Sequence, residues 1–219
     1  METDRIAVIT ESGNGLGESF AKILLANNYL VILAANQKCY ASLSQGEVIP
    51  QKCDLIEVDF KSEESLSHLK SLIEARYGHL DLLVNNAEIA NGFGQKIDQI
   101  KLDEVRELYE VNLFSVIRII QLLKPLLEQS ENPRIINISS SMGDINKMTD
   151  EKFCYSDYCM TAYASSKAAL EMYTHLQCKE FKSSKISIST FDPINPNNCT
   201  HNAVKICDGI ESEFISLIK

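Results

Sequence analysis

Short apolar runs alternate with longer segments in which apolar residues recur every three or four positions. The short runs have the length and composition of buried strands, and they cover residues 5–10, 30–35, 55–59, 80–84, 134–139 and 186–190. Strand and helix patterns alternate throughout, which predicts a doubly wound parallel α/β sheet of Rossmann type with helices on both faces. No repeat or linker interrupts the pattern, so we expect a single domain over residues 1–219.

The helical segments differ in how clearly their ends are marked. Ser62 is a predicted N-cap for a helix that Gly78 ends. Residues 101–128 are predicted to form one long helix, and its apolar middle suggests burial on nearly every side. The other expectations are a short helix and loop at 37–51, an irregular insert at 143–161, a helix from Tyr163 to about Phe181, and a last helix at about 200–218.

Composition narrows the function classes. Of the 219 residues, 45% are hydrophobic and 23% are charged, as in an ordinary soluble protein, and the net charge of −9 argues against nucleic acid or an anionic membrane as a partner. No apolar run is long enough to span a bilayer. The seven scattered cysteines contain no Cys-x-x-Cys, and the four histidines lack metal-ligand spacing. We therefore expect reduced thiols, no metal and a cytoplasmic location.

Tyr163 and Lys167 form the strongest candidate for chemistry. On a helix, residues four apart lie on one face with Cβ atoms about 5–6 Å apart. A cation at that distance favours phenolate and lowers the tyrosine pKa from its usual value of about 10. Such a tyrosine could donate a proton to a carbonyl or accept one from an alcohol. Alone, the pattern also arises by chance.

A glycine-rich turn at residues 11–17 joins the first predicted strand to a helix. Backbone N–H groups and a helix N-terminus in such a turn can hold a pyrophosphate. A tight strand–helix turn without a ligand has the same pattern.

These features belong to an ordered set of motifs along the chain. The set comprises Thr10-Glu-Ser-Gly-Asn-Gly-Leu-Gly17, Asn85-Asn-Ala-Glu88, Asn112, Ser140-Ser-Met-Gly143 and Tyr163-Ala-Ser-Ser-Lys167. Together the motifs resemble those of the short-chain dehydrogenase/reductase family, and the resemblance covers essentially the whole chain.

The resemblance implies an oxidoreductase that transfers a hydride between NAD or NADP and a small carbonyl or alcohol. Tyr163 would be the general acid/base, and Ser140 would hold the substrate oxygen. Lys167 would lower the tyrosine pKa and bond the nicotinamide ribose, while Asn112 would position a relay water. Asp59 would face the adenine. The implied cofactor-binding residues are Thr10, Ser12, Gly15, Leu16, Gly17, Asn36, Asp59, Asn86, Tyr163, Lys167 and Pro193.

The chain also departs from the family pattern. Glu11 stands at the first glycine of the turn, and Glu88 stands at the glycine of Asn-Asn-Ala-Gly. Pro196 replaces a residue whose N–H would bond the carboxamide, and proline has no N–H. The run Ala35-Asn-Gln-Lys38 has neither an acid for a ribose hydroxyl nor an arginine for a 2′-phosphate, so NAD and NADP both stay open.

Two functional hypotheses follow. The intact Asn112, Ser140, Tyr163 and Lys167 favour an active oxidoreductase. The departures at the cofactor-binding positions favour a catalytically silent relative that binds a partner or another ligand. Of the two, we favour the enzyme.

Residues 111–123 are apolar on nearly every side of their helix, and the helix from Tyr163 is lined with alanine. Both features predict a homodimer or homotetramer. The alternative is burial of both faces within one subunit. In the insert, Phe153, Tyr155 and Tyr158 fit an apolar substrate, but a loop packing on itself would have the same composition.

Overall fold

The six strands form one all-parallel sheet, in the order β3-β2-β1-β4-β5-β6. The computed structural model describes residues 4–11, 15–45, 52–158, 160–193 and 208–218. The strands are β1 (Arg5–Thr10), β2 (Tyr29–Ala35), β3 (Cys53–Glu57), β4 (Leu82–Asn85), β5 (Arg134–Ile138) and β6 (Ser187–Phe191). The predicted Rossmann-type sheet is confirmed, with small shifts at the strand ends.

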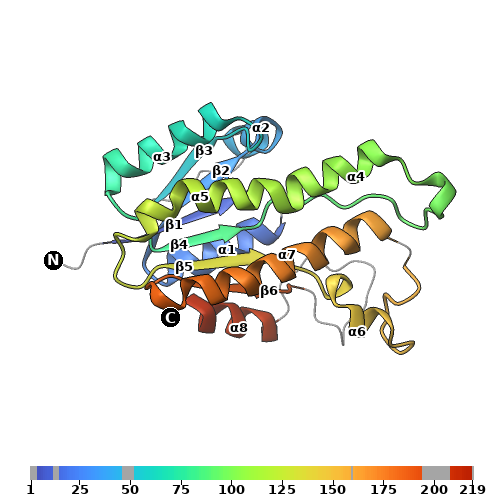
Figure 1. Cartoon of the computed structure of the whole chain (residues 1–219). Helices are drawn as coiled ribbons and strands as arrows, with labels where there is room; N and C mark the ends of the chain where they lie inside the picture. The colour runs from blue at the N-terminus through green and yellow to red at the C-terminus, as the bar shows by residue number, and fades with distance from the viewer. Residues whose placement is uncertain (1–3, 12–14, 46–51, 159, 194–207, 219) are drawn as a thin grey trace.

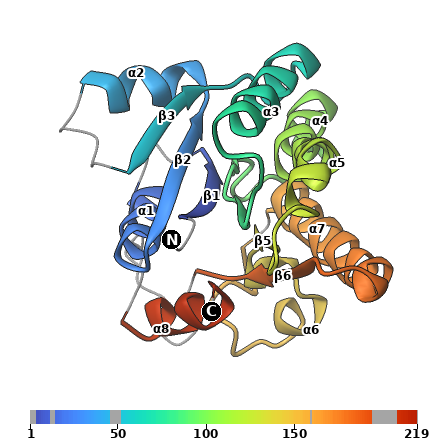
Figure 2. The same cartoon turned by 90° about the vertical axis from the view of Figure 1, so that its left-hand side faces the viewer.

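Helices cover both faces of the sheet (Figures 1 and 2). On one face lie α1 (Gly15–Ala26) and α8 (Asp208–Ile218), and on the other lie α3 (Glu63–Tyr77), α5 (Ser115–Leu127) and α7 (Thr161–Glu180). Each face has its own buried apolar cluster, because strands covered on both sides are apolar on both sides. A shorter helix, α2 (Gln37–Gln45), contacts β2 and β3.

The helix predicted over residues 101–128 is interrupted in its hydrogen bonding. It consists of α4 (Leu102–Tyr109), a π-helical turn η2 (Glu110–Phe114) and α5. Inserted π turns often occur at functional sites, since they change the direction of the side chains around them. Asn112 lies inside this turn with 1% of its surface exposed.

The predicted helix signals are confirmed at Ser62 and Gly78. Ser62 accepts a hydrogen bond from the N–H of Ser65, and Gly78 ends α3 with a left-handed φ of 74°. The start predicted for the last helix, near residue 200, lies outside the described residues.

The predicted insert at 143–161 contains the one-turn helix α6 (Ile145–Met148), followed by turns. Cys154 in this segment is disulfide-bonded, so the expectation of reduced thiols is wrong at that position. Within the described part of the chain, no helix is both long and apolar enough to cross a membrane.

Candidate active site

The candidate residues converge at the carboxyl edge of the sheet. Thr10 ends β1, and Ser140 follows β5 after one residue. Helix α7 crosses beside this edge, and its first two turns carry Tyr163 and Lys167. In parallel α/β sheets this edge is where ligands bind.

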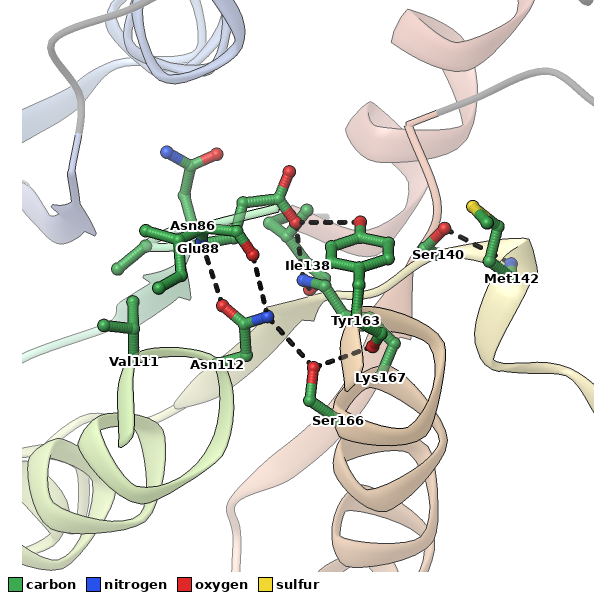
Figure 3. A network of polar contacts seen from close by, with 12 residues as sticks. Asn86, Glu88, Val111, Asn112, Ile138, Ser140, Met142, Tyr163, Ser166 and Lys167 are labelled. Carbon is green, nitrogen blue, oxygen red and sulfur yellow. Dashed lines mark hydrogen bonds and ion pairs between the residues drawn. The ribbon is translucent and has the colours of Figure 1, made fainter. Parts of the chain in front are cut away.

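Lys167 and Glu88 form an ion pair at the centre of the site (Figure 3). The Lys167 Nζ lies 2.6 Å from Glu88 Oε2 and donates a second hydrogen bond, of 2.9 Å, to the Ile138 carbonyl oxygen. Lys167 is 1% exposed, so its charge is stabilised by these partners rather than by water. The Tyr163 hydroxyl donates to the same Glu88 oxygen over 3.3 Å.

This arrangement reverses the expected effect on Tyr163. Burial raises the pKa of Tyr163 above its ordinary value, the negative charge of Glu88 raises the pKa further, and a hydrogen bond with Ser140 opposes the shift. The expected lowering of the Tyr163 pKa by Lys167 is therefore wrong for this structure. The physical reasons are that burial disfavours the charged phenolate, that Glu88 adds a negative charge beside the hydroxyl, and that the same carboxylate pairs with the Lys167 cation.

Asn112 fixes the loop that carries Glu88. Its Oδ1 accepts from the Ile89 N–H at 2.9 Å, and its Nδ2 donates to the Ile89 carbonyl and to Ser166 Oγ, each at 3.0 Å. Ser166 in turn donates to the Tyr163 carbonyl at 2.8 Å. Asn112 thus joins the π turn, the loop after β4 and helix α7, and it holds the residue next to Glu88 in place.

The other end of the same loop is fixed by Thr10 and Asn86. Thr10 Oγ1 accepts from the N–H groups of Asn86 and Ala87, each at 3.0 Å. The Asn86 side chain donates to the carbonyl oxygens of Thr10 and Glu11, at 3.1 and 2.8 Å. Both residues were predicted to contact a cofactor, but here their buried side chains connect β1 to the loop after β4.

Ser140 lies in a tight turn against α7. Its Oγ accepts from the Met142 N–H at 3.3 Å. A Cβ added at Gly143 would lie 2.8 Å from backbone atoms of Lys167 and Ala168, so only glycine permits this approach. Asp192, which sequence reasoning missed, accepts hydrogen bonds from the N–H and Oγ of Ser141 and so joins the end of β6 to this turn.

A cleft of about 540 Å³ opens beside the site. Its lining includes the predicted Asn36 and Asp59, together with Glu11, Glu88 and Val111. Asn36 Oδ1 accepts from the Cys39 N–H, and Asp59 is exposed.

The remaining predicted cofactor residues lie on other segments of the chain. Gly15, Leu16 and Gly17 form the first turn of α1, and Pro193 follows β6. Ser12 and Pro196 lie outside the described residues.

The pairing of Glu88 with Lys167 was also missed by sequence reasoning. Glu88 stood out as a replaced glycine, but its direction depends on the hydrogen bonds of Asn112, which lies 24 positions further along the chain. No periodicity or spacing in the sequence signals that contact.

The ion pair predicts an energetic coupling. In a double-mutant cycle of Glu88→Gln and Lys167→Met, we expect a coupling energy of about 1–3 kcal/mol in the free energy of unfolding, measured by urea denaturation. Breaking a fully buried ion pair costs about 3–5 kcal/mol. We expect a smaller coupling energy here because Glu88 is partly exposed. Additive effects of the two substitutions would contradict the contact.

Comparison with known proteins gives a consistent result. The short chain dehydrogenase family matches residues 5–195. A rhamnolipid-biosynthesis 3-oxoacyl-[acyl-carrier-protein] reductase of Pseudomonas aeruginosa is 29% identical, over 97% of this chain and 81% of its own.

Among solved structures, the Pseudomonas aeruginosa RhlG/NADP active-site complex is 28% identical, with a TM-score of 0.71 over 88% of this chain and 73% of its own. A putative carbonyl reductase, Sniffer, of Caenorhabditis elegans shares the fold, with a TM-score of 0.79, 22% identity, and coverage of 99% of this chain and 91% of its own. The matched family segment spans the whole sheet and the site described above. The chain therefore belongs to the short chain dehydrogenase family.

Proposed function

We propose that the protein is an NAD(P)-dependent oxidoreductase acting on a carbonyl/alcohol pair. The observation that carries the proposal is the convergence of Ser140, Tyr163 and Lys167 at the carboxyl edge of the sheet, beside a cleft. Family membership supports it. So do the reductase activity named for the rhamnolipid-biosynthesis relative and the NADP named for the RhlG complex.

The chemistry divides between the cofactor and the chain. When bound, the nicotinamide supplies or accepts the hydride. Ser140 and the Tyr163 hydroxyl hold the substrate oxygen, and Tyr163 gives that oxygen a proton during reduction and takes it back during oxidation. The cleft of about 540 Å³ lined by Asn36 and Asp59 would take the adenosine. Lys167, which lies beside the cleft, would hold the ribose next to the nicotinamide.

Burial and Glu88 together keep the Tyr163 hydroxyl protonated in this structure. The charge of Glu88 and the burial of Tyr163 both favour the protonated phenol. A protonated phenol is ready to donate to a carbonyl, whereas oxidation of an alcohol first requires phenolate. We therefore propose that Tyr163 is poised as the proton donor to a carbonyl near neutral pH.

The same ion pair favours the second candidate function, a catalytically silent binding protein. Lys167 already has an anionic partner in Glu88, so a cofactor ribose must compete for it. Fluorescence titration with NADH and NADPH at sub-millimolar concentration separates the two functions. Saturable binding supports the enzyme, and no change in cofactor fluorescence supports the silent protein.

Tyr163→Phe tests the catalytic assignment. We expect turnover to fall by about 10²–10⁴, the usual cost of losing a positioned acid/base, while cofactor affinity and the thermal unfolding midpoint change little. The measurement is steady-state oxidation of NADH or NADPH with the best substrate from a panel of aliphatic and aromatic aldehydes and ketones. Turnover equal to that of the unmodified protein would rule out Tyr163 as the proton donor.

Glu88→Gln tests the control of the Tyr163 pKa. Removing the carboxylate charge lowers the pKa of Tyr163, so reduction is lost at a lower pH and oxidation begins at a lower pH. The measurement is the pH profile of kcat/KM in both directions. Glu107→Gln, on the lining of the same cleft, is the matched control. Unchanged profiles in Glu88→Gln would show that Glu88 does not act on Tyr163 during turnover.

We also propose that the protein is a homodimer or homotetramer. Phe114, Met172 and Leu176 are exposed by 43%, 60% and 52%, and they lie on η2 and on α7, which pack side by side. Burying such side chains in a second subunit is favourable, by about 25 cal/mol per Å² of apolar surface. Multi-angle light scattering at micromolar concentration should give a multiple of 24.5 kDa, and a monomer mass would overturn the proposal.

The aromatic side chains of the insert bear on the choice of substrate. Tyr155 packs edge-on against both Phe153 and Tyr158. These aromatic rings therefore contribute to packing within the insert. Tyr155 and Tyr158 also pack against the buried cluster that includes Tyr163. This placement supports an apolar substrate group beside the Tyr163 hydroxyl.

A further inference from the structure

Glu11 lies between the carboxyl ends of two neighbouring strands. It follows β1 directly, and its N–H donates to the Ala34 carbonyl of β2 at 2.8 Å. Its own carbonyl accepts from Asn86 Nδ2 at 2.8 Å. The backbone has a left-handed φ of 53°, a region that costs a non-glycine residue free energy and persists only where the surroundings impose it. The direction of the Glu11 side chain is therefore set by the strands on both sides.

The Glu11 carboxylate reaches the start of α2. It accepts hydrogen bonds from Asn36 and Cys39, and the side chain is half-buried. Glu11, Asn36, Lys38 and Cys39 line one end of the cleft, and Asp59 lines it from the neighbouring strand end. The carboxylate thus borders the cleft rather than closing it.

This point of a Rossmann sheet has a known chemical role. An acidic residue near the carboxyl end of the second strand accepts hydrogen bonds from the adenosine ribose hydroxyls of NAD, and a basic residue there accommodates the 2′-phosphate of NADP. In this chain the second strand is followed by Asn36, which carries no charge. The structure brings a carboxylate to the same place from the first strand.

We propose that Glu11 is the residue that selects NAD(H) over NADP(H). It accepts hydrogen bonds from the adenosine ribose hydroxyls. It repels a 2′-phosphate, because a carboxylate and a phosphate within hydrogen-bonding range of the same ribose are both negatively charged. The inference rests on the proposed function, since it assigns the cofactor of the same cleft. Glu11, a departure from the family's glycine, is thereby a specificity determinant.

Lys38 favours the opposite selection. It lines the same end of the cleft, and its ammonium could meet a 2′-phosphate. Lys38 is exposed, however, whereas Glu11 is half-buried and held by hydrogen bonds. An exposed cation is screened by water and salt more strongly than a half-buried carboxylate, so the carboxylate dominates the selection.

The test uses fragments that lack the nicotinamide, because their binding does not depend on displacing Glu88 from Lys167. ADP-ribose and its 2′-phosphorylated form are titrated calorimetrically into the unmodified protein, Glu11→Gln and Lys38→Ala. We expect ADP-ribose to bind the unmodified protein at least about tenfold more tightly than the 2′-phosphorylated form. Glu11→Gln should reduce this preference about tenfold, and Lys38→Ala should keep or increase it. The same series is then run with NADH and NADPH.

The outcomes separate this inference from the proposed function. A preference of the unmodified protein for the 2′-phosphorylated fragment, or an unchanged preference in Glu11→Gln, overturns the role of Glu11 while leaving the oxidoreductase in place. The predicted selectivity without turnover on any carbonyl substrate upholds Glu11 and overturns the activity. Binding of neither fragment overturns the inference, and binding of NADPH in that case still upholds the oxidoreductase.

Discussion

The parallel direction of all six strands is the constraint on which the site depends. Because every strand ends at the same edge, residues far apart in the sequence meet there: Thr10 after β1, Glu88 after β4, Ser140 after β5 and Asp192 after β6. A mixed sheet would send some of these strand ends to the opposite edge. Helix α7 then needs to supply only Tyr163 and Lys167 to complete the arrangement, and its close approach at Gly143 holds it against the Ser140 turn.

Two glutamates, Glu11 and Glu88, stand at positions where the family has glycine, and each adds a carboxylate to the site. Glu88 pairs with a buried cation in Lys167 and also acts on the Tyr163 hydroxyl, so its charge is directed at the side chains of the site. Glu11 accepts hydrogen bonds from the neutral residues Asn36 and Cys39, which bring no opposite charge to it. Substitution of glycine by the same residue type thus has different consequences at the two positions, and the difference comes from the neighbouring side chains.

The fold could be predicted from the sequence almost completely, since buried strands and amphipathic helices leave distinct periodicities. The capping signals at Ser62 and Gly78 were also readable, because they act within one turn of helix. The π turn around Asn112 was not readable, since it changes the hydrogen bonding without changing the apolar pattern. The sequence also identified the Tyr163 helix, but the direction of the Tyr163 pKa shift depends on a carboxylate 75 positions away.

The loop from Asn86 to Ile89 has no regular secondary structure, yet the N–H groups of Asn86, Ala87 and Ile89 all have buried side-chain acceptors. The N–H groups of Asn86 and Ala87 donate to buried Thr10, and that of Ile89 donates to buried Asn112. Those acceptors belong to β1 and to the π turn, so exchange of these amide protons with solvent requires the loop to separate from both elements. We therefore expect the loop to open only together with these elements, so that release of Lys167 by Glu88 would take place through rotation of the Glu88 side chain.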